Sequence, residues 1–238
     1  MDRCVLYIAP PSICPEPRLT SALFPDLVSQ FHAAHKLTHL KWILPNAPQN
    51  RDVMVRAWFM PKSFSPIPMP KRSGEPDPED NDEDDYEDGM MKSVEYICGL
   101  IDKEVEAGVP IERIVVGGFS QGCAISLLVG LVSRYSGKLG GVVGLSGYLP
   151  LGEKVGKMME ERKEREKNTA QTKWFLAHGA RDQLVPKREF MRYQDKIEGW
   201  EGERVEVKLY EGMGHATVGA EVRDLYGWLE KTLPEIQA

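Results

Sequence analysis

The pentapeptide at residues 118–122, GFSQG, places a serine hydroxyl at the junction of two hydrophobic patterns. The β-branched run at 114–116 predicts a buried strand, and the apolar residues of 124–132 predict a helix. A sharp strand-to-helix turn exposes the serine, and the glycines on both sides allow neighbouring backbone segments to approach the turn closely. The N-terminus of the helix directs free N–H groups and positive potential to the same point. We therefore expect Ser120 to be a nucleophile; the alternative is a glycine-rich turn without chemistry.

A serine nucleophile needs a base, and the base needs a carboxylate that orients it. His215 follows the predicted strand 205–210 in a glycine-containing loop, and Asp182 lies just beyond the predicted strand 174–177. The chain order Ser, Asp, His is that of α/β-hydrolase triads, and each member follows a strand where that fold presents reactive groups. We therefore predict a triad of Ser120, His215 and Asp182. In the alternative, the aspartate only caps the next helix and the histidine is an ordinary loop residue.

The remaining histidines do not predict a second site. His32, His35 and His39 recur on one face of a predicted helix, a spacing that could hold a metal ion. No carboxylate or cysteine is suitably placed beside them in the sequence, so a half-exposed helix face is the preferred interpretation. His178 ends the predicted strand 174–177, where a buried turn histidine is expected.

The elements that must position the triad alternate along the chain. Strands alternating with helices predict a mostly parallel central sheet with helices on both faces, the α/β-hydrolase fold. The 238 residues are enough for one such domain, spanning residues 1–238. The predicted strands are 41–44, 114–116, 141–145, 174–177 and 205–210, the last nearer a sheet edge, and the predicted helices lie within 20–40, 94–105, 124–132, 186–197 and 222–229.

Two charged segments interrupt this pattern. Residues 75–88 contain ten acidic and no basic residues, so the net charge of −6 belongs to this segment rather than to the fold. It predicts an acidic, disordered insertion at about 71–89, with docking of a basic partner as the alternative. A charged helical insertion is predicted at about 152–168. There Leu151, Val155 and Met158 form only a brief apolar stripe, so the helix is expected to pack at one end.

Several classes of protein are disfavoured. No apolar run reaches the length of a transmembrane helix, and Pro10 and Pro11 break the N-terminal run, which makes it a poor secretory signal. The four cysteines lack the spacing of a metal site or a disulfide framework, so free thiols in the cytosol are expected. There is no basic stripe interleaved with aromatic residues, and nucleic-acid binding is therefore not predicted.

Beyond the triad, several motifs resemble those of one known family. They are ILPNAP at 43–48, WF at 58–59, GGFSQG at 117–122, LSGYLP at 145–150, HGARDQLVP at 178–186 and GMGH at 212–215. With these motifs the chain resembles the acyl-protein thioesterases, and especially their fungal members. These are cytosolic esterases related to small carboxylesterases and lysophospholipases. The resemblance covers about residues 20–235, interrupted by the two charged segments.

The resemblance implies roles for individual residues. Ser120 would be the nucleophile, His215 the general base and then acid, Asp182 the orienter of the histidine, and the backbone N–H of Gln121 one oxyanion donor. It implies S-acylated proteins or acyl esters as substrates and no metal or organic cofactor. A cytoplasmic and also nuclear location, with transient contact to membrane surfaces, is the matching expectation.

Two segments depart from the family pattern. The family has a segment such as HGLGD after its first strand, which supplies the second oxyanion donor. Here the candidate first strand is 5–9, and PPSI at 10–13 stands where the glycine-rich loop belongs. Proline has no N–H to donate, and loss of one oxyanion donor typically costs about 3–4 kcal/mol. In addition, the family's Trp-Phe-Asp becomes Trp58-Phe59-Met60. A weakened enzyme and an alternative gene start are the two explanations.

These observations predict a cytosolic serine hydrolase that cleaves long-chain acyl thioesters on protein cysteines through an acyl-enzyme. The acyl chain is expected in an apolar groove near the carboxyl edge of the sheet, with Trp58 and Leu149 as walls. One alternative is a carboxylesterase or lysophospholipase acting on oxygen esters. The other is a catalytically silent protein that binds acyl chains or basic partners.

Overall fold

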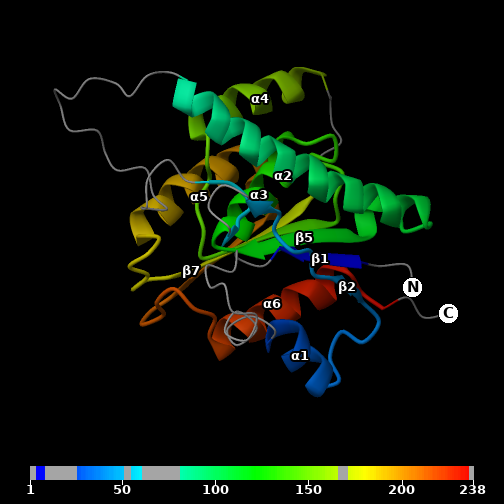
Figure 1. Cartoon of the computed structure of the whole chain (residues 1–238). Coiled ribbons are helices and arrows are strands. Elements are labelled where there is room, and N and C mark those ends of the chain that lie inside the picture. Colours follow the sequence, from blue (N-terminus) through cyan, green and yellow to red (C-terminus); the bar gives the residue numbers. More distant parts are fainter. Residues whose placement is uncertain (1–3, 9–25, 51–54, 61–80, 166–170, 236–238) are drawn as a thin grey trace.

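The computed structural model describes residues 4–8, 26–50, 55–60, 81–165 and 171–235 of the chain. These residues form a six-stranded parallel sheet with helices on both faces (Figure 1), which confirms the predicted architecture. The strand order is β2-β1-β5-β6-β7-β8, and β3 and β4 form a separate antiparallel pair. The strands are β1 (Cys4–Ile8), β2 (Lys41–Ile43), β3 (Gln49–Asn50), β4 (Val55–Arg56), β5 (Ile114–Phe119), β6 (Gly141–Leu145), β7 (Lys173–Gly179) and β8 (Val205–Tyr210).

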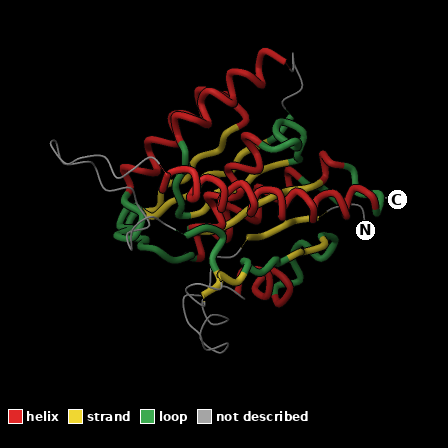
Figure 2. The backbone as a smooth tube through the Cα atoms, turned by 45° about the horizontal axis from the view of Figure 1, so that its top comes forward, coloured by secondary structure: helices red, strands yellow, loops and turns green. Residues whose placement is uncertain are grey.

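Helices α1 to α5 connect strands that follow one another in the chain, α6 follows the last strand, and together they surround the sheet (Figure 2). Two predicted strands, 141–145 and 205–210, coincide with β6 and β8, and the predicted helix 222–229 lies within α6. Within the described part of the chain, no helix is long and apolar enough to cross a bilayer. The α-helices are α1 (Asp26–Ala33), α2 (Asn81–Glu106), α3 (Gln121–Val132), α4 (Gly152–Arg165), α5 (Lys187–Glu201) and α6 (Gly219–Thr232), with short 3-10 helices η1 (Ile111–Arg113) and η2 (Gly202–Arg204).

Successive strand residues face opposite sides of the sheet, and each side packs against its own helices. Val116 and Trp174 lie in a core cluster with residues of α2, α3, α4 and α5. Their strand neighbours Val115 and Phe175 lie in a second cluster with residues of α1 and α6. Figure 1 shows the same division, with α1 and α6 on one side of the sheet. Because both faces are covered, the central strands are apolar without alternation.

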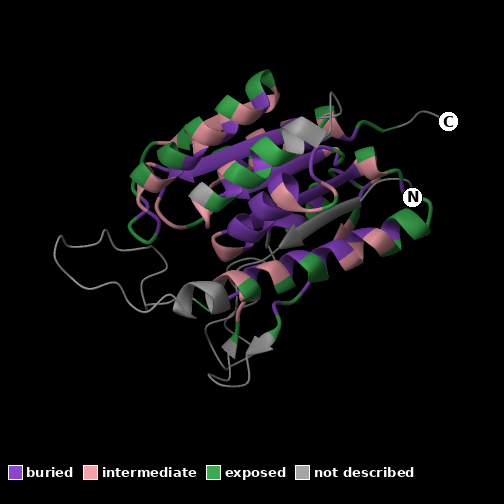
Figure 3. Ribbon diagram, turned by 90° about the horizontal axis from the view of Figure 1, so that it is seen from above, coloured by how far each residue is buried: buried purple, intermediate pink, exposed green. Residues whose placement is uncertain are grey.

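Burial is highest in the central strands of the sheet and in the helix α3 (Figure 3). β5 is buried at every position, and α3 is buried from Gly122 to Leu131. The edge strand β8 is mostly half-buried, as its alternating pattern predicted. The serine turn is therefore anchored at the centre of the core, where close packing leaves little room for movement.

The predicted disordered acidic insertion at about 71–89 overlaps a helix, which is a correction. α2 begins at Asn81, so residues 81–89 are helical, while residues 71–80 lie outside the described residues. Acidic side chains are favoured in the first turns of a helix, whose N-terminus carries partial positive charge. Met90, Val94 and Ile97, further along the same helix, are fully buried and fix it to the core. Charge alone was therefore a poor guide to where the ordered segment begins.

Two other helices differ in detail from the prediction. The charged helix exists as α4, but it is anchored by Val155 and Met159, both fully buried, while Met158 is exposed. α1 ends at Ala33, so His35 and His39 lie beyond it and the three early histidines do not share a helix face. The described residues contain no group of three or more His, Cys, Asp or Glu placed to hold a metal ion.

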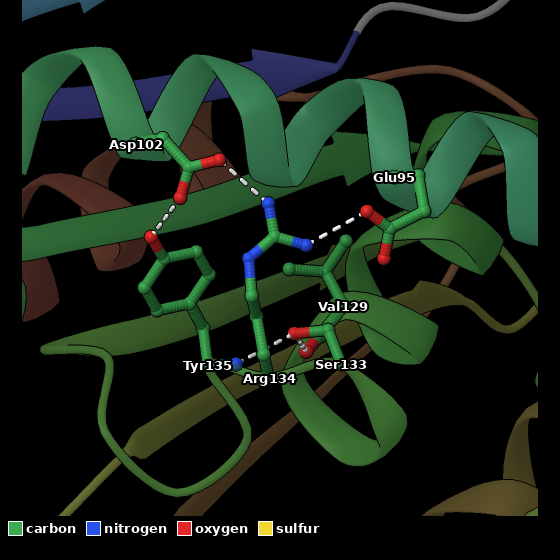
Figure 4. A network of polar contacts seen from close by, with 6 residues as sticks. All are labelled: Glu95, Asp102, Val129, Ser133, Arg134 and Tyr135. Carbon is green, nitrogen blue, oxygen red and sulfur yellow. Dashed lines mark hydrogen bonds and ion pairs between the residues drawn. The ribbon is translucent and has the colours of Figure 1, made fainter.

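A polar network fastens α2 to the end of α3 (Figure 4). The Arg134 guanidinium donates to Glu95 at 2.7 Å and to Asp102 at 2.6 Å, and the Tyr135 hydroxyl donates to the second oxygen of Asp102. The arginine holds the pKa of Asp102 below its ordinary value, with the tyrosine hydroxyl adding to the effect. Single exposed ion pairs contribute little, but here one planar guanidinium joins two turns of α2. The network fixes how α2 lies across α3.

Glu221 is a buried carboxyl group in the first turn of α6, with 1% of its surface exposed. Neither of its oxygens makes a hydrogen bond of normal geometry with a described residue, although the backbone of Val218 favours the charged form. Burial raises the pKa of Glu221 from 4.5 to about 8. Between these values the folded protein binds more protons than the unfolded chain. The free energy of unfolding is therefore expected to fall as the pH rises through this window.

Glu221→Gln is expected to remove this pH dependence, because glutamine is never charged. The variant should match the wild type near about pH 4.5 and be more stable near about pH 9, by as much as roughly 4 kcal/mol. Urea denaturation at both pH values measures the difference, with Glu203→Gln as an exposed control. An equal change at both pH values would mean that packing, rather than ionisation, is responsible.

Candidate active site

Ser120 lies at the turn between β5 and α3, as the sequence predicted. It is the N-cap residue of α3, and its φ of 56° and ψ of −118° are strained for a residue with a side chain. Its N–H donates to the carbonyl of Leu145 at 3.0 Å, and its own carbonyl accepts from Ala124 at 3.2 Å. The backbone is thus held from both sides in a conformation that it would not otherwise adopt.

Gly147 permits this turn from the neighbouring segment, just after β6. A Cβ atom at this position would lie 2.9 Å from the carbonyl oxygen of Ser120 and 2.4 Å from the Cβ of Cys123. Contacts this short do not occur between real Cβ atoms and backbone, so any larger residue would displace the serine turn. The glycine of the LSGYLP motif therefore has a direct packing role beside the nucleophile.

The structure brings the three predicted residues into one hydrogen-bonded row. The Nε2 atom of His215 lies 3.1 Å from the Oγ atom of Ser120. Its Nδ1 atom lies 2.7 Å from the Oδ2 atom of Asp182. The aspartate side chain is fully buried, and the histidine side chain is 16% exposed. The two residues come from loops that follow β7 and β8, so all three lie at the carboxyl edge of the sheet.

Backbone contacts join the two loops that carry the aspartate and the histidine. The N–H of Ala180 donates to Tyr210, and the N–H of Arg181 donates to Met213, both at 2.9 Å. A Cβ atom on Gly179 would lie 2.3 Å from the carbonyl oxygen of Met213, so only glycine allows this approach. The separation of the imidazole and the carboxylate is therefore set by main-chain bonds.

The Asp182 carboxylate is held at both oxygens. Oδ1 accepts from the N–H groups of Leu184 and Val185, each at 2.9 Å, while Oδ2 faces His215. Burial by itself would raise the pKa of Asp182, but the hydrogen bonds from His215 and Val185 outweigh it and leave the pKa below its ordinary value. The group is therefore a carboxylate in the folded protein and accepts the Nδ1–H of the imidazole.

The side chain of Gln121 makes contacts that the sequence analysis missed. Its Oε1 accepts from the N–H of Trp58, and its Nε2 donates to the carbonyl of Phe59, both at 3.2 Å. These bonds fasten the WF motif to the residue beside the nucleophile. Gln121 is also the first residue of α3, where a backbone N–H has no acceptor within the helix. Nothing in the sequence indicated that residues 58–59 lie close to residue 121, except that both segments belong to family motifs.

The two predicted walls of an acyl groove lie in or against the main core cluster. Trp58 is 1% exposed, with its ring 6.3 Å from that of Tyr96, and Leu149 is half-buried. Their contact with an acyl chain stays a prediction. The predicted first strand is β1, whose Ile8 pairs with Gly118 in β5. Residues 9–13, where the second oxyanion donor was expected, lie outside the described residues.

The fold and the row of hydroxyl, imidazole and buried carboxylate define a hydrolase of the α/β-hydrolase class. More narrowly, the chain belongs to the phospholipase/carboxylesterase family, whose model matches residues 25–233. It is similar to acyl-protein thioesterase 1 of Yarrowia lipolytica, with 33% identity over 220 residues, covering 88% of this chain and 85% of that protein. Acyl-protein thioesterase 1 of Gibberella zeae is 35% identical over 212 residues, covering 87% and 83%.

Solved structures agree on the fold. The crystal structure of SOBER1 from Arabidopsis thaliana has a TM-score of 0.70 and 22% identity, covering 97% of this chain and 99% of that one. Acyl-protein thioesterase 2 from Zea mays has a TM-score of 0.68 and 23% identity, covering 98% and 94%. The family, the fold and the nature of the protein as a hydrolase are thereby confirmed.

Proposed function

We propose that this protein hydrolyses long-chain acyl thioesters on protein cysteines, with Ser120, His215 and Asp182 as its catalytic triad. The observation that carries the proposal is the position of His215, whose two ring nitrogens lie 3.1 Å from the serine hydroxyl and 2.7 Å from the carboxylate. The choice of acyl thioesters as substrates is supported by relatives in several fungi that are named acyl-protein thioesterases.

Acylation begins when Ser120 Oγ attacks the thioester carbonyl and its proton passes to His215 Nε2. Asp182 accepts the Nδ1–H of the imidazole and stabilises the imidazolium that forms. In this mechanism the backbone N–H of Gln121, at the N-terminus of α3, stabilises the developing oxyanion. When the tetrahedral intermediate collapses, the C–S bond breaks and His215 returns the proton to the departing thiol. Ser120 then carries the acyl group as an ester.

Deacylation repeats these steps with water in place of the serine. His215 removes a proton from water, the resulting hydroxide attacks the acyl-enzyme carbonyl, and the proton is returned to Ser120 Oγ. The products are a free protein thiol and a fatty acid. A cysteine thiol ionises near about pH 8.5, far below an alcohol, so the acylation step with a thioester needs less proton transfer than with an oxygen ester.

Purified protein is expected to react covalently with a fluorophosphonate probe at Ser120 and to turn over a palmitoyl-thioester substrate. Parallel assays compare the rate of hydrolysis of this thioester with the rates for a short-chain acyl ester and a lysophospholipid. Heat-denatured protein is the control. Preference for the oxygen esters would replace the proposal with a carboxylesterase or lysophospholipase. An acyl ligand that stabilises the fold but is never cleaved, with no probe labelling, would point to a binding protein.

We also propose that the protein works in the cytosol, with a nuclear pool. Cys98 and Cys123 are buried free thiols, and burial raises the pKa of each, to about 12 for Cys123. Such thiols are unreactive and are compatible with a reducing compartment. Fluorescence microscopy of the tagged protein in a fungal cell tests the location, and a signal confined to the secretory pathway would contradict it.

A further inference from the structure

We infer that His178 is a positioning residue for the triad, acting on Asp182 through the main chain of Val185. The inference rests on the proposed function, since it assigns a role within that triad. His178 was expected only to be a buried turn histidine; it lies inside β7, fully buried, four residues before the aspartate.

The argument begins with an unbroken series of hydrogen bonds. The Nε2 atom of His178 lies 2.9 Å from the carbonyl oxygen of Val185. The N–H of the same Val185 donates to Asp182 Oδ1 at 2.9 Å, and Oδ2 of that carboxylate accepts from His215. Val185 therefore accepts a hydrogen bond from His178 of β7 at its carbonyl oxygen and donates one to the Asp182 carboxylate from its N–H.

The bond from His178 to Val185 defines the proton position on the ring. A carbonyl oxygen only accepts, so Nε2 must carry the hydrogen. Nδ1 is buried and has no hydrogen-bond partner among the described residues, so a proton there would be buried without an acceptor. Burial lowers the pKa of His178, while the nearby Asp182 opposes this effect only in part. The ring is thus a neutral, fixed donor.

Packing holds the ring in this orientation. Phe190 of α5 stacks on the imidazole, with ring centroids 4.9 Å apart and an angle of 14° between the planes. The ring does not bond directly to the carboxylate, because its Nε2 atom lies 3.8 Å from Asp182 Oδ2. The hydrogen-bonded route from the ring to the aspartate therefore passes through Val185, which is itself 1% exposed.

Loss of the donor would leave the buried carbonyl of Val185 without its partner. A buried, unsatisfied carbonyl is costly, and the turn at 182–185 can avoid that penalty only by moving. Such movement shifts the N–H groups that hold Oδ1. A displacement of about 1 Å in a catalytic group can lower the rate by about 100-fold. The expected effect is on kcat, because His178 has no contact with the serine or with a substrate in this arrangement.

Two variants of equal length separate the hydrogen bond from the packing. His178→Gln keeps an N–H donor near the place of Nε2, whereas His178→Met fills a similar volume without one, and both lose the aromatic ring. In the methionine variant we expect kcat for thioester hydrolysis to fall about 10- to 100-fold with KM nearly unchanged. The glutamine variant should recover most of that loss. Equal kcat values for the two variants would overturn the inference, whatever their common loss of stability.

A measurement on the wild-type protein keeps the inference testable if both variants fail to fold. In nitrogen-15 NMR of histidine-labelled protein at neutral pH, we expect His178 as the neutral Nε2–H tautomer. An Nδ1–H tautomer or a doubly protonated ring would overturn the inference. Lack of turnover by the wild type would instead contradict the proposed function, and the tautomer would still be measured.

Discussion

Ser120→Ala is expected to lower kcat for thioester and ester hydrolysis by at least about 10⁴-fold while the protein stays folded. Without Oγ no acyl-enzyme can form, and only binding and the oxyanion donors remain to accelerate attack by water. Alanine keeps the Cβ atom, so the strained φ of 56° at this position and its packing are retained. Loss of activity would therefore report loss of the nucleophile rather than collapse of the turn.

Initial rates with a palmitoyl thioester measure the effect, and intact-protein mass spectrometry after fluorophosphonate treatment shows whether the probe still attaches. Ser133→Ala is the matched control, because Ser133 is the C-cap of α3, at the opposite end of the helix from Ser120. If the Ser120 variant kept more than about a tenth of the wild-type rate, another group would have to be the nucleophile.

Asp182→Asn is expected to lower kcat by about 10⁴-fold, because it changes which ring nitrogen of His215 carries the proton. The amide oxygen must take the place of Oδ1, because the N–H groups of Leu184 and Val185 both point there. The amide NH₂ then faces Nδ1 of the imidazole, which can only accept. The remaining ring proton moves to Nε2, and that nitrogen loses the lone pair that should take the serine proton.

The variant is nearly isosteric, so its melting temperature should change little compared with its rate. Asp195→Asn, on the exposed side of α5, is the control for the change of one charge. Nitrogen-15 NMR should show His215 as the Nε2–H tautomer in the variant and the Nδ1–H tautomer in the wild type. A variant with the wild-type rate would contradict the proposed orienting role of the aspartate.

The strands and the triad were predictable because their signals are local. β6 and β8 match the predicted ranges, because an apolar run in β6 and an alternating apolar pattern in β8 each end close to a glycine-containing turn. Ser120, Asp182 and His215 each follow such a run. In a parallel sheet the carboxyl ends of the strands share one edge, so the sequence order alone indicated that the three side chains would meet.

Other features depend on contacts that sequence does not show. The beginning of α2 at Asn81 depends on anchorage of the helix by Met90 and on the favourable position of acidic residues at its N-terminus. The contact between Gln121 and the WF segment joins residues about sixty positions apart, and no periodicity reveals it. The role inferred for His178 likewise depends on one carbonyl oxygen, at Val185, whose direction only coordinates give.

Ser120, Asp182 and His215 follow β5, β7 and β8, so the proposed base lies in the loop after the last strand of the described sheet. During synthesis on a ribosome, the serine turn emerges long before residue 215 leaves the exit tunnel. Under the proposed mechanism, a nascent chain cannot hydrolyse an ester until residue 215 has emerged. Chains that terminate before residue 215 are therefore expected to contribute no esterase activity.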